Sequence, residues 1–175
     1  CRSGEVEAVI SAGNTGAATA ASLLYMGRIP GVSRPAIMTL FPSVKNRVAV
    51  LDVGANTDCK PGYLYQFGAM ASIFTERILG YSSPRVGLLN IGEESTKGNE
   101  ATVEAYSLFK QSNLNFVGNV EGRDIFKNVA DLVVCDGFVG NVLLKFGESF
   151  FGFLTHKLRE KTAKNLLRTA GALVM

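Results

Sequence analysis

The stretch Val86-Gly-Leu-Leu-Asn-Ile-Gly-Glu-Glu-Ser-Thr-Lys-Gly-Asn-Glu100 contains the pattern that decides the fold. Residues 86–91 form a short apolar run, which predicts a buried strand, and the residues from Asn99 onward predict a helix. Between them lies a loop of Gly, Glu, Ser, Thr and Lys. A strand that ends in such a loop just before a helix directs backbone N–H groups and the Lys97 ammonium toward one point. This arrangement suits an anionic group.

The same order of strand, polar loop and helix recurs along the chain. Strands are predicted at residues 6–10, 36–41, 47–53, 115–118 and 131–135, and helices at residues 17–26, 63–79 and 100–110 and after residue 141. At least four such units in succession predict an α/β fold, a three-layer α/β/α arrangement with a mostly parallel sheet. Because ligands of such sheets bind at the carboxyl ends of the strands, the polar loops are expected to line one edge.

Polar side chains in these loops are the candidate ligand contacts. In residues 11–16, glycines allow close approach of the backbone, and Ser11, Asn14 and Thr15 supply hydrogen bonds at a helix N-terminus. The alternative is an ordinary capped helix start. Arg123 is a forked donor suited to phosphate or carboxylate, although loop arginines are also often solvated or salt-bridged. The loop at residues 136–141 precedes the last helix and contributes Gly137 and Asn141.

The remaining titratable residues exclude several reaction classes. His156 is the sole histidine and lies far from these loops, so a Ser-His-Asp or Cys-His mechanism is not expected. Cys59 next to Lys60 is interpreted as a bystander. The aspartates match no metal-ligand signature, and a G-x-G-x-x-G motif is absent, so neither a metal nor a cofactor is expected. A site rich in donors and poor in bases suits a nucleophile that arrives ionised, such as inorganic phosphate.

Length and composition suggest one domain. The chain has 175 residues, of which 47% are hydrophobic, which is enough for one sizeable core. It begins at Cys1 without a methionine and is expected to be a fragment of a longer protein. No signal peptide or membrane-spanning run is visible, so a cytoplasmic protein is expected. Three widely spaced cysteines predict reduced thiols rather than disulfides.

The net positive charge is concentrated at the C-terminal end. Residues 1–150 hold 13 Lys and Arg against 14 Asp and Glu, whereas residues 151–175 hold 5 against 1. This uneven distribution argues against a nucleic-acid binder. If residues 146–175 form one amphipathic helix, its basic residues make a stripe, which consists of Lys157, Lys161, Lys164 and Arg168. Such an extension suits a membrane surface or an acidic partner, or a helix that buries its apolar side in a dimer or a core.

Five motifs, taken in order, resemble the PlsX family of bacterial phosphate acyltransferases. They are residues 11–17 (SAGNTGA), 51–61 (LDVGANTDCKP), 87–99 (GLLNIGEESTKGN), 118–124 (GNVEGRD) and 133–141 (VVCDGFVGN). The resemblance implies transfer of a fatty acyl group from acyl carrier protein to inorganic phosphate, which gives acyl phosphate for phospholipid synthesis. It also implies an isocitrate/isopropylmalate dehydrogenase-like fold, a homodimer and peripheral association with the inner face of the cell membrane.

On this resemblance, we assign hypothetical roles to the loop residues. Lys97 and Arg123 would hold phosphate, with further donors from the loops that contain Ser11, Thr15, Gly137 and Asn141. Asn14 or Asn90 would polarise the thioester carbonyl during attack, and the basic stripe would receive the carrier protein or lipid head groups. Two alternatives remain open: an NAD(P)- and metal-dependent hydroxy-acid dehydrogenase of the same fold, and a non-catalytic adaptor.

Overall fold

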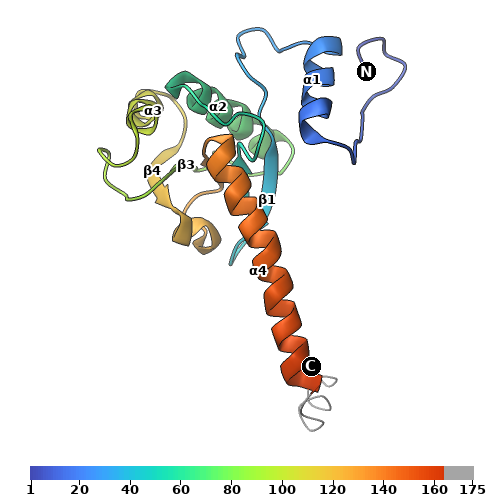
Figure 1. The fold of residues 1–175 in the computed structure, drawn as a ribbon. Coiled ribbons are helices and arrows are strands. Elements are labelled where there is room, and N and C mark those ends of the chain that lie inside the picture. Colours follow the sequence, from blue (N-terminus) through green and yellow to red (C-terminus); the bar gives the residue numbers. More distant parts are fainter. Residues whose placement is uncertain (164–175) are drawn as a thin grey trace. The chain divides into compact units, whose positions relative to one another are not determined.

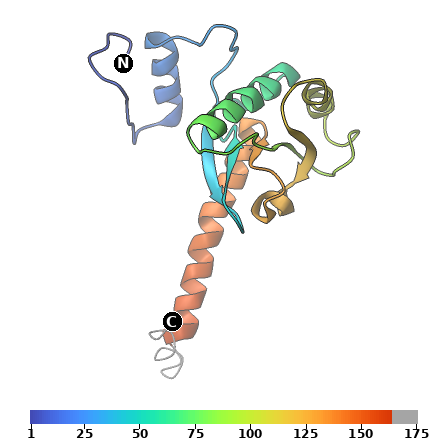
Figure 2. The same cartoon turned by 180° about the vertical axis from the view of Figure 1, so that it is seen from behind.

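The computed structural model describes residues 1–163, which form an α/β structure (Figures 1 and 2). Two predicted members of the basic stripe, Lys164 and Arg168, lie outside the described residues. The chain divides into two compact units: the first comprises residues 1–141, and the second begins at Val142. The prediction of a single domain with an extension from residue 146 stays a prediction.

A five-stranded sheet organises the first unit, with the strand order β1-β2-β5-β3-β4. The strands are β1 (Met38–Pro42), β2 (Arg47–Leu51), β3 (Val86–Asn90), β4 (Phe116–Glu121) and β5 (Leu132–Val134). β1 pairs with β2 in antiparallel fashion at one edge, and the pairs β2–β5, β5–β3 and β3–β4 are parallel. The prediction of a mostly parallel sheet is therefore confirmed.

Two helices, α2 (Pro61–Arg77) and α3 (Glu100–Lys110), pack on one face of this sheet. They follow β2 and β3, and both connections move along the sheet in the same direction, so right-handed crossovers place both helices on one side. The return from β4 to β5 moves in the opposite direction. It contains the short helix η1 (Gly122–Lys127), which contacts β1 as well as β4.

The main core lies between the sheet and these two helices. Phe67 of α2 and Phe109 of α3 are fully buried there, together with alternate residues of the central strands. Gly68 is required where the helices meet, because a Cβ at this position would overlap the Phe109 ring. The apolar residues toward the C-terminal end of α2 are not all buried: Phe67 and Ala71 lie in the core, whereas Ile78, just after the helix, is exposed.

Several predicted elements are confirmed, and two are wrong. Helices were expected at residues 63–79 and 100–110 and appear as α2 and α3, and α1 (Thr15–Tyr25) corresponds to the expected helix at residues 17–26. Residues 6–10 do not form the predicted strand, and Ile10 is fully exposed. A strand needs a neighbour for its backbone hydrogen bonds, and no described segment pairs with these residues.

The second incorrect prediction concerns residues 136–141, which were expected to be a loop. In the structure Gly137 begins the helix α4 (Gly137–Ala163). The Asp136 carboxylate accepts a hydrogen bond from the Val139 N–H at 2.9 Å, and the Gly140 N–H donates to the Asp136 carbonyl. Asp136 therefore caps the helix in the usual manner, which starts it directly after β5.

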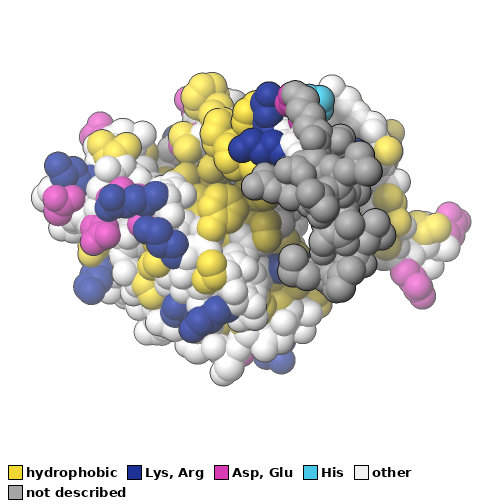
Figure 3. Space-filling view, turned by 90° about the horizontal axis from the view of Figure 1, so that it is seen from below, with side chains coloured by type: hydrophobic (Ala, Val, Ile, Leu, Met, Phe, Trp, Pro, Cys, Tyr) yellow, Lys and Arg dark blue, Asp and Glu magenta, His cyan; other side chains and the backbone are white. Residues whose placement is uncertain are grey.

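Helix α4 exposes many large apolar side chains along its length. They include Val142, Phe146, Phe150, Phe153 and Leu158. Figure 3 shows hydrophobic side chains and Lys and Arg side chains exposed on the same view of the molecule. The predicted basic residue Lys157 is paired with Glu160 at 3.1 Å, and Lys161 is exposed. No helix within residues 1–163 is long and apolar enough to cross a membrane.

An ion pair ties the amino ends of β3 and β5 together. The Arg85 guanidinium donates two hydrogen bonds to the Asp131 carboxylate, at 3.0 and 2.9 Å, and the Arg85 backbone N–H donates a third at 2.9 Å. Burial by itself would raise the pKa of the Asp131 carboxyl, but the bonds from Arg85 outweigh burial and hold this pKa below its ordinary value. The folded state therefore favours the ionised carboxylate.

We predict that Asp131→Asn lowers the free energy of unfolding by about 2 kcal/mol at pH 7, because charge-assisted hydrogen bonds are lost. Since the folded pKa lies below the unfolded value of about 3.9, the contribution is present above that value and disappears as pH falls through the folded pKa. Urea unfolding between pH 7 and pH 3 measures this. Glu148→Gln, which breaks the exposed Lys145–Glu148 pair, serves as the control. Equal losses in both variants would contradict the prediction.

Candidate functional site

The carboxyl ends of the parallel strands lead into three polar loops, and the loop after β2 is built around Asp52. This residue is completely buried, and its carboxylate accepts five hydrogen bonds. The donors are the backbone N–H groups of Ile37, Gly54, Ala55 and Asn56 and the Asn56 side-chain amide, at 2.7–3.2 Å. The carboxylate thereby fixes the loop and the segment that enters β1.

The first turn of α4 packs directly against this loop. The Gly137 N–H donates to the Asn56 carbonyl at 2.7 Å. A Cβ on Gly137 would lie 2.6 Å from the same carbonyl oxygen, and a Cβ on Gly140 would overlap the Asp52 carbonyl. Glycine is therefore required at both positions, because backbone meets backbone without room for a side chain.

A small polar cavity of about 160 Å³ lies beside this contact. It is lined by Thr57, Asp58, Cys59, Leu64, Asn99, Ala101, Thr102 and Asp136. These residues follow β2, β3 and β5, so the cavity lies at the carboxyl edge of the sheet, and none of the predicted site residues lines it. Asn99 and Thr102 border it at the N-terminus of α3, where the Thr102 N–H and hydroxyl both donate to Asn99. Asp58 and Asp136 place carboxylates in its lining.

The Cys59 thiol, which lines this cavity, ionises less readily than a free cysteine thiol. Burial is the main cause that raises the pKa of the Cys59 thiol to about 11, and the negative charge of three neighbouring aspartates acts in the same direction. Burial also raises the pKa of Cys135, whose thiol donates to the Asp52 carbonyl. Both thiols are protonated near neutral pH, which agrees with the interpretation of Cys59 as a bystander.

The loop after β3, which contains Lys97, is held by two asparagine side chains. Asn90 donates to the Lys97 carbonyl at 2.8 Å and accepts from the Ile91 N–H at 2.8 Å. Asn119 of β4 donates to the Glu94 carbonyl at 2.7 Å, and its own side-chain oxygen is buried without a partner. In contrast, the Lys97 side chain is exposed and forms no ion pair within residues 1–163.

The other predicted site residues are more widely distributed. Arg123 lies after β4 and is paired through two nitrogens with Glu121, both at 3.0 Å. Asn14 caps α1 by accepting from the Ala17 N–H, and Ser11 accepts from the Gly13 N–H. Thr15 is the first residue of α1. Among the described residues, no hydrogen bond joins the segment 11–15 to the loops after β2, β3 and β5.

Sequence reasoning missed the residues that build this edge. Asp52 was not singled out as the residue that holds this loop, and neither were Asn56, Gly140 and Asn119. Within residues 1–163 no group of three or more His, Cys, Asp or Glu side chains is placed to hold a metal. The available signal was the spacing of Asp52 and Asn56, since an aspartate at a strand end followed by glycine often accepts several backbone hydrogen bonds.

Comparison with known proteins shows the family. A family model described as "Fatty acid synthesis protein" matches residues 1–175. The chain belongs to this family. It is 51% identical over 173 residues to the phosphate acyltransferase of Pelotomaculum thermopropionicum, and 53% identical over 175 residues to that of Desulfitobacterium hafniense. Each match covers 99% of the chain but only 51% and 52% of the relative. The chain thus spans about half the length of these relatives.

The family member also resembles a solved structure. The EutD phosphotransacetylase from Staphylococcus aureus aligns with a TM-score of 0.57 and 15% sequence identity, over 75% of this chain and 46% of that protein. At this identity the likeness concerns the fold alone. It confirms an α/β architecture that is shared with a phosphotransacetylase.

We predict that Gly140→Ala lowers the free energy of unfolding by about 2 kcal/mol or more, because its methyl group displaces the Asp52 loop or the first turn of α4. Gly152→Ala is the matched control in the same helix. A Cβ on Gly152 meets no atom within 4 Å, so this variant is expected to gain about 0.5–1 kcal/mol from helix propensity. Thermal and urea unfolding measure both. A neutral Gly140→Ala would refute the close packing.

Proposed function

We propose that this chain forms part of an acyltransferase that transfers a fatty acyl group from acyl carrier protein to inorganic phosphate and releases acyl phosphate. The observation that carries the proposal is the identity of about 50% over nearly the whole chain to proteins named phosphate acyltransferase. The family's description as fatty acid synthesis proteins supports an acyl substrate. These names do not favour a hydroxy-acid dehydrogenase. We further propose that the complete fold is three-layered and isocitrate/isopropylmalate dehydrogenase-like.

Phosphate would be held by cationic side chains from the loops after β3 and β4. Lys97 is the stronger candidate, since its ammonium has no carboxylate partner in the described part of the chain and its loop is fixed by Asn90 and Asn119. Arg123 would exchange Glu121 for phosphate. Ser11, Thr15 and Asn141 would add donors, whereas Gly137 would contribute through its close packing, because its N–H is already bonded to Asn56.

In the reaction, a phosphate oxygen attacks the thioester carbonyl carbon. The new C–O bond forms, the C–S bond breaks, and the phosphate proton passes to the departing thiolate. A thiol has a pKa of roughly 8.5, so it leaves without a strong acid. Asn14 is the better candidate to polarise the carbonyl, because its amide nitrogen donates to no group among residues 1–163, whereas both ends of the Asn90 amide are committed.

We predict that the full-length protein forms acyl phosphate from acyl carrier protein thioester and phosphate, detected by hydroxylamine trapping. Lys97→Ala and Arg123→Ala should raise the KM for phosphate by about tenfold or more, because a charge-assisted contact is lost. Lys110→Ala, which removes an exposed lysine at the far end of α3, should leave it unchanged. Unchanged phosphate dependence in both loop variants would refute their assignment.

Helix α4 supports a second part of the proposal, in which it buries its apolar side in a homodimer or at the inner face of the membrane. Its exposed phenylalanines include Phe146 and Phe150, which stack at 5.9 Å, and Lys157 and Lys161 lie further along the helix. Apolar and basic side chains together suit anionic lipid head groups or the acidic carrier protein.

We predict that Phe146→Ser combined with Phe150→Ser weakens dimerisation or flotation with vesicles that contain anionic lipid, because exposed apolar area is removed. Sedimentation equilibrium measures the first and vesicle flotation the second. Ser149→Ala on the same helix is the control. Unchanged mass and unchanged flotation in the double variant would refute a role of this face.

A further inference from the structure

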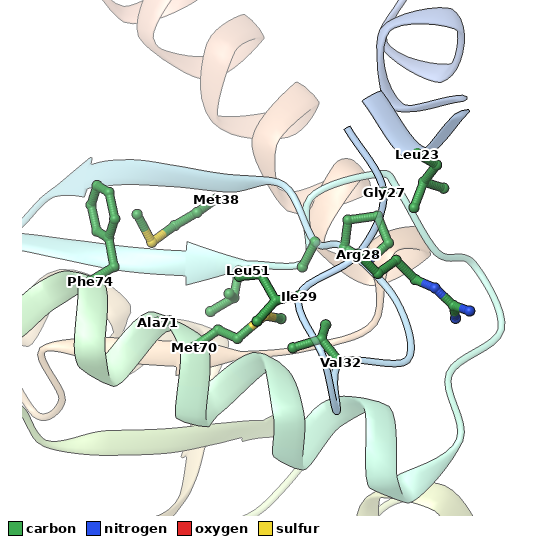
Figure 4. Close-up of a pocket in the computed structure, with 12 residues that line it drawn as sticks. Leu23, Gly27, Arg28, Ile29, Val32, Met38, Leu51, Met70, Ala71 and Phe74 are labelled. Carbon is green, nitrogen blue, oxygen red and sulfur yellow. The ribbon is translucent and has the colours of Figure 1, made fainter. Parts of the chain in front are cut away.

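An apolar groove lies between helix α2 and the segment that connects α1 to β1 (Figure 4). It has a volume of about 450 Å³. The side of the connecting segment contributes Ile29, Val32 and Ala36, and the side of the helix contributes Met70 and Phe74. Leu51 of β2 lies between them in Figure 4, while the Arg28 guanidinium points away from the centre of the groove.

One side chain clamps the connecting segment to the helix. Gln66 of α2 accepts a hydrogen bond from the Ser33 N–H at 2.8 Å and donates to the Gly31 carbonyl at 3.1 Å. These two bonds tie the segment to α2 next to Val32, which lines the groove. The groove is therefore held in shape by polar contacts at its rim rather than by packing across its centre.

The groove leads directly to the loop built around Asp52. Leu51 precedes Asp52, and the Pro35 carbonyl at the groove accepts from the Asn56 amide at 2.7 Å. The Ile37 N–H donates to the Asp52 carboxylate at 3.0 Å. Helix α2 begins near this loop and runs away from it, so Phe74, close to the end of the helix, marks the distant end of the groove.

We propose that this groove binds the fatty acyl chain of the thioester substrate, with the carbonyl at the strand-end loops and the methyl end toward Phe74; the inference rests on the function proposed above. A fatty acyl group is polar at one end only, which matches an apolar channel that opens beside a polar loop. Ile29 is 70% exposed and Phe74 40% exposed. An acyl chain would cover both and gain their apolar contact area.

The groove is tested by a charge placed in it. In the full-length protein, Ile29→Glu should lower kcat/KM for the hexadecanoyl thioester by about tenfold or more while it changes that for the butanoyl thioester little, because the long chain buries far more apolar surface along the groove than the short chain does. The KM for phosphate should not change. Ile78→Glu is the matched control: Ile78 is 67% exposed and does not line the groove.

A direct binding measurement tests the groove independently of the reaction. A dansyl-labelled fatty acid should bind the wild type and Ile78→Glu with equal affinity and Ile29→Glu about tenfold more weakly. If the wild type forms no acyl phosphate, the proposed function fails, yet selective loss of probe binding in Ile29→Glu still supports the groove. Equal losses for both thioesters, equal effects of the two glutamates, or no probe binding to the wild type would overturn the inference.

Discussion

The buried carboxylate of Asp52 is the interaction on which the strand-end edge depends. Five N–H groups from the β1 entry segment and the β2–α2 loop converge on it. A buried charge is costly unless it is fully hydrogen-bonded, so the backbone around it has little freedom. Since Asn56 also bonds to Pro35 and accepts from Gly137, the same loop connects the sheet edge to α4 and to the apolar groove.

The second constraint on the strand-end edge is the close approach of two backbone segments. Gly137 and Gly140 bring the start of α4 against the carbonyl groups of Asn56 and Asp52. As a result, one loop separates two different environments: a small polar cavity near the N-terminus of α3 and a larger apolar groove beside α2. Chemistry that joins a charged acceptor to an acyl donor needs both environments within reach of each other.

Much of the fold was predictable because periodic apolar patterns reflect burial on a sheet face or a helix face. The same patterns misled at residues 6–10, where apolar residues alone do not supply a neighbouring strand. For the site, sequence patterns identified the loops but not the hydrogen-bond and ion-pair partners of the residues in them. Asn90 holds the Lys97 loop, Arg123 is paired with Glu121, and the Gly137 N–H is bonded to Asn56. The Gly137–Asn56 bond joins residues far apart in the chain, whereas the other two contacts are local and depend on how the chain folds after β3 and β4.

Apart from residues 6–10 and 136–141, the sequence by itself determined the order of strands, loops and helices, together with the mostly parallel sheet and the motifs by which the chain resembles phosphate acyltransferases. These follow from local periodicity and from short runs of residues. Only the tertiary structure decided that Asp52 is the centre of the strand-end edge of the sheet and that Asn119 supports the Lys97 loop. It also decided that an apolar groove adjoins the Asp52 loop. The physical reason is that each of these contacts joins residues that are distant in the chain, which a linear pattern does not specify.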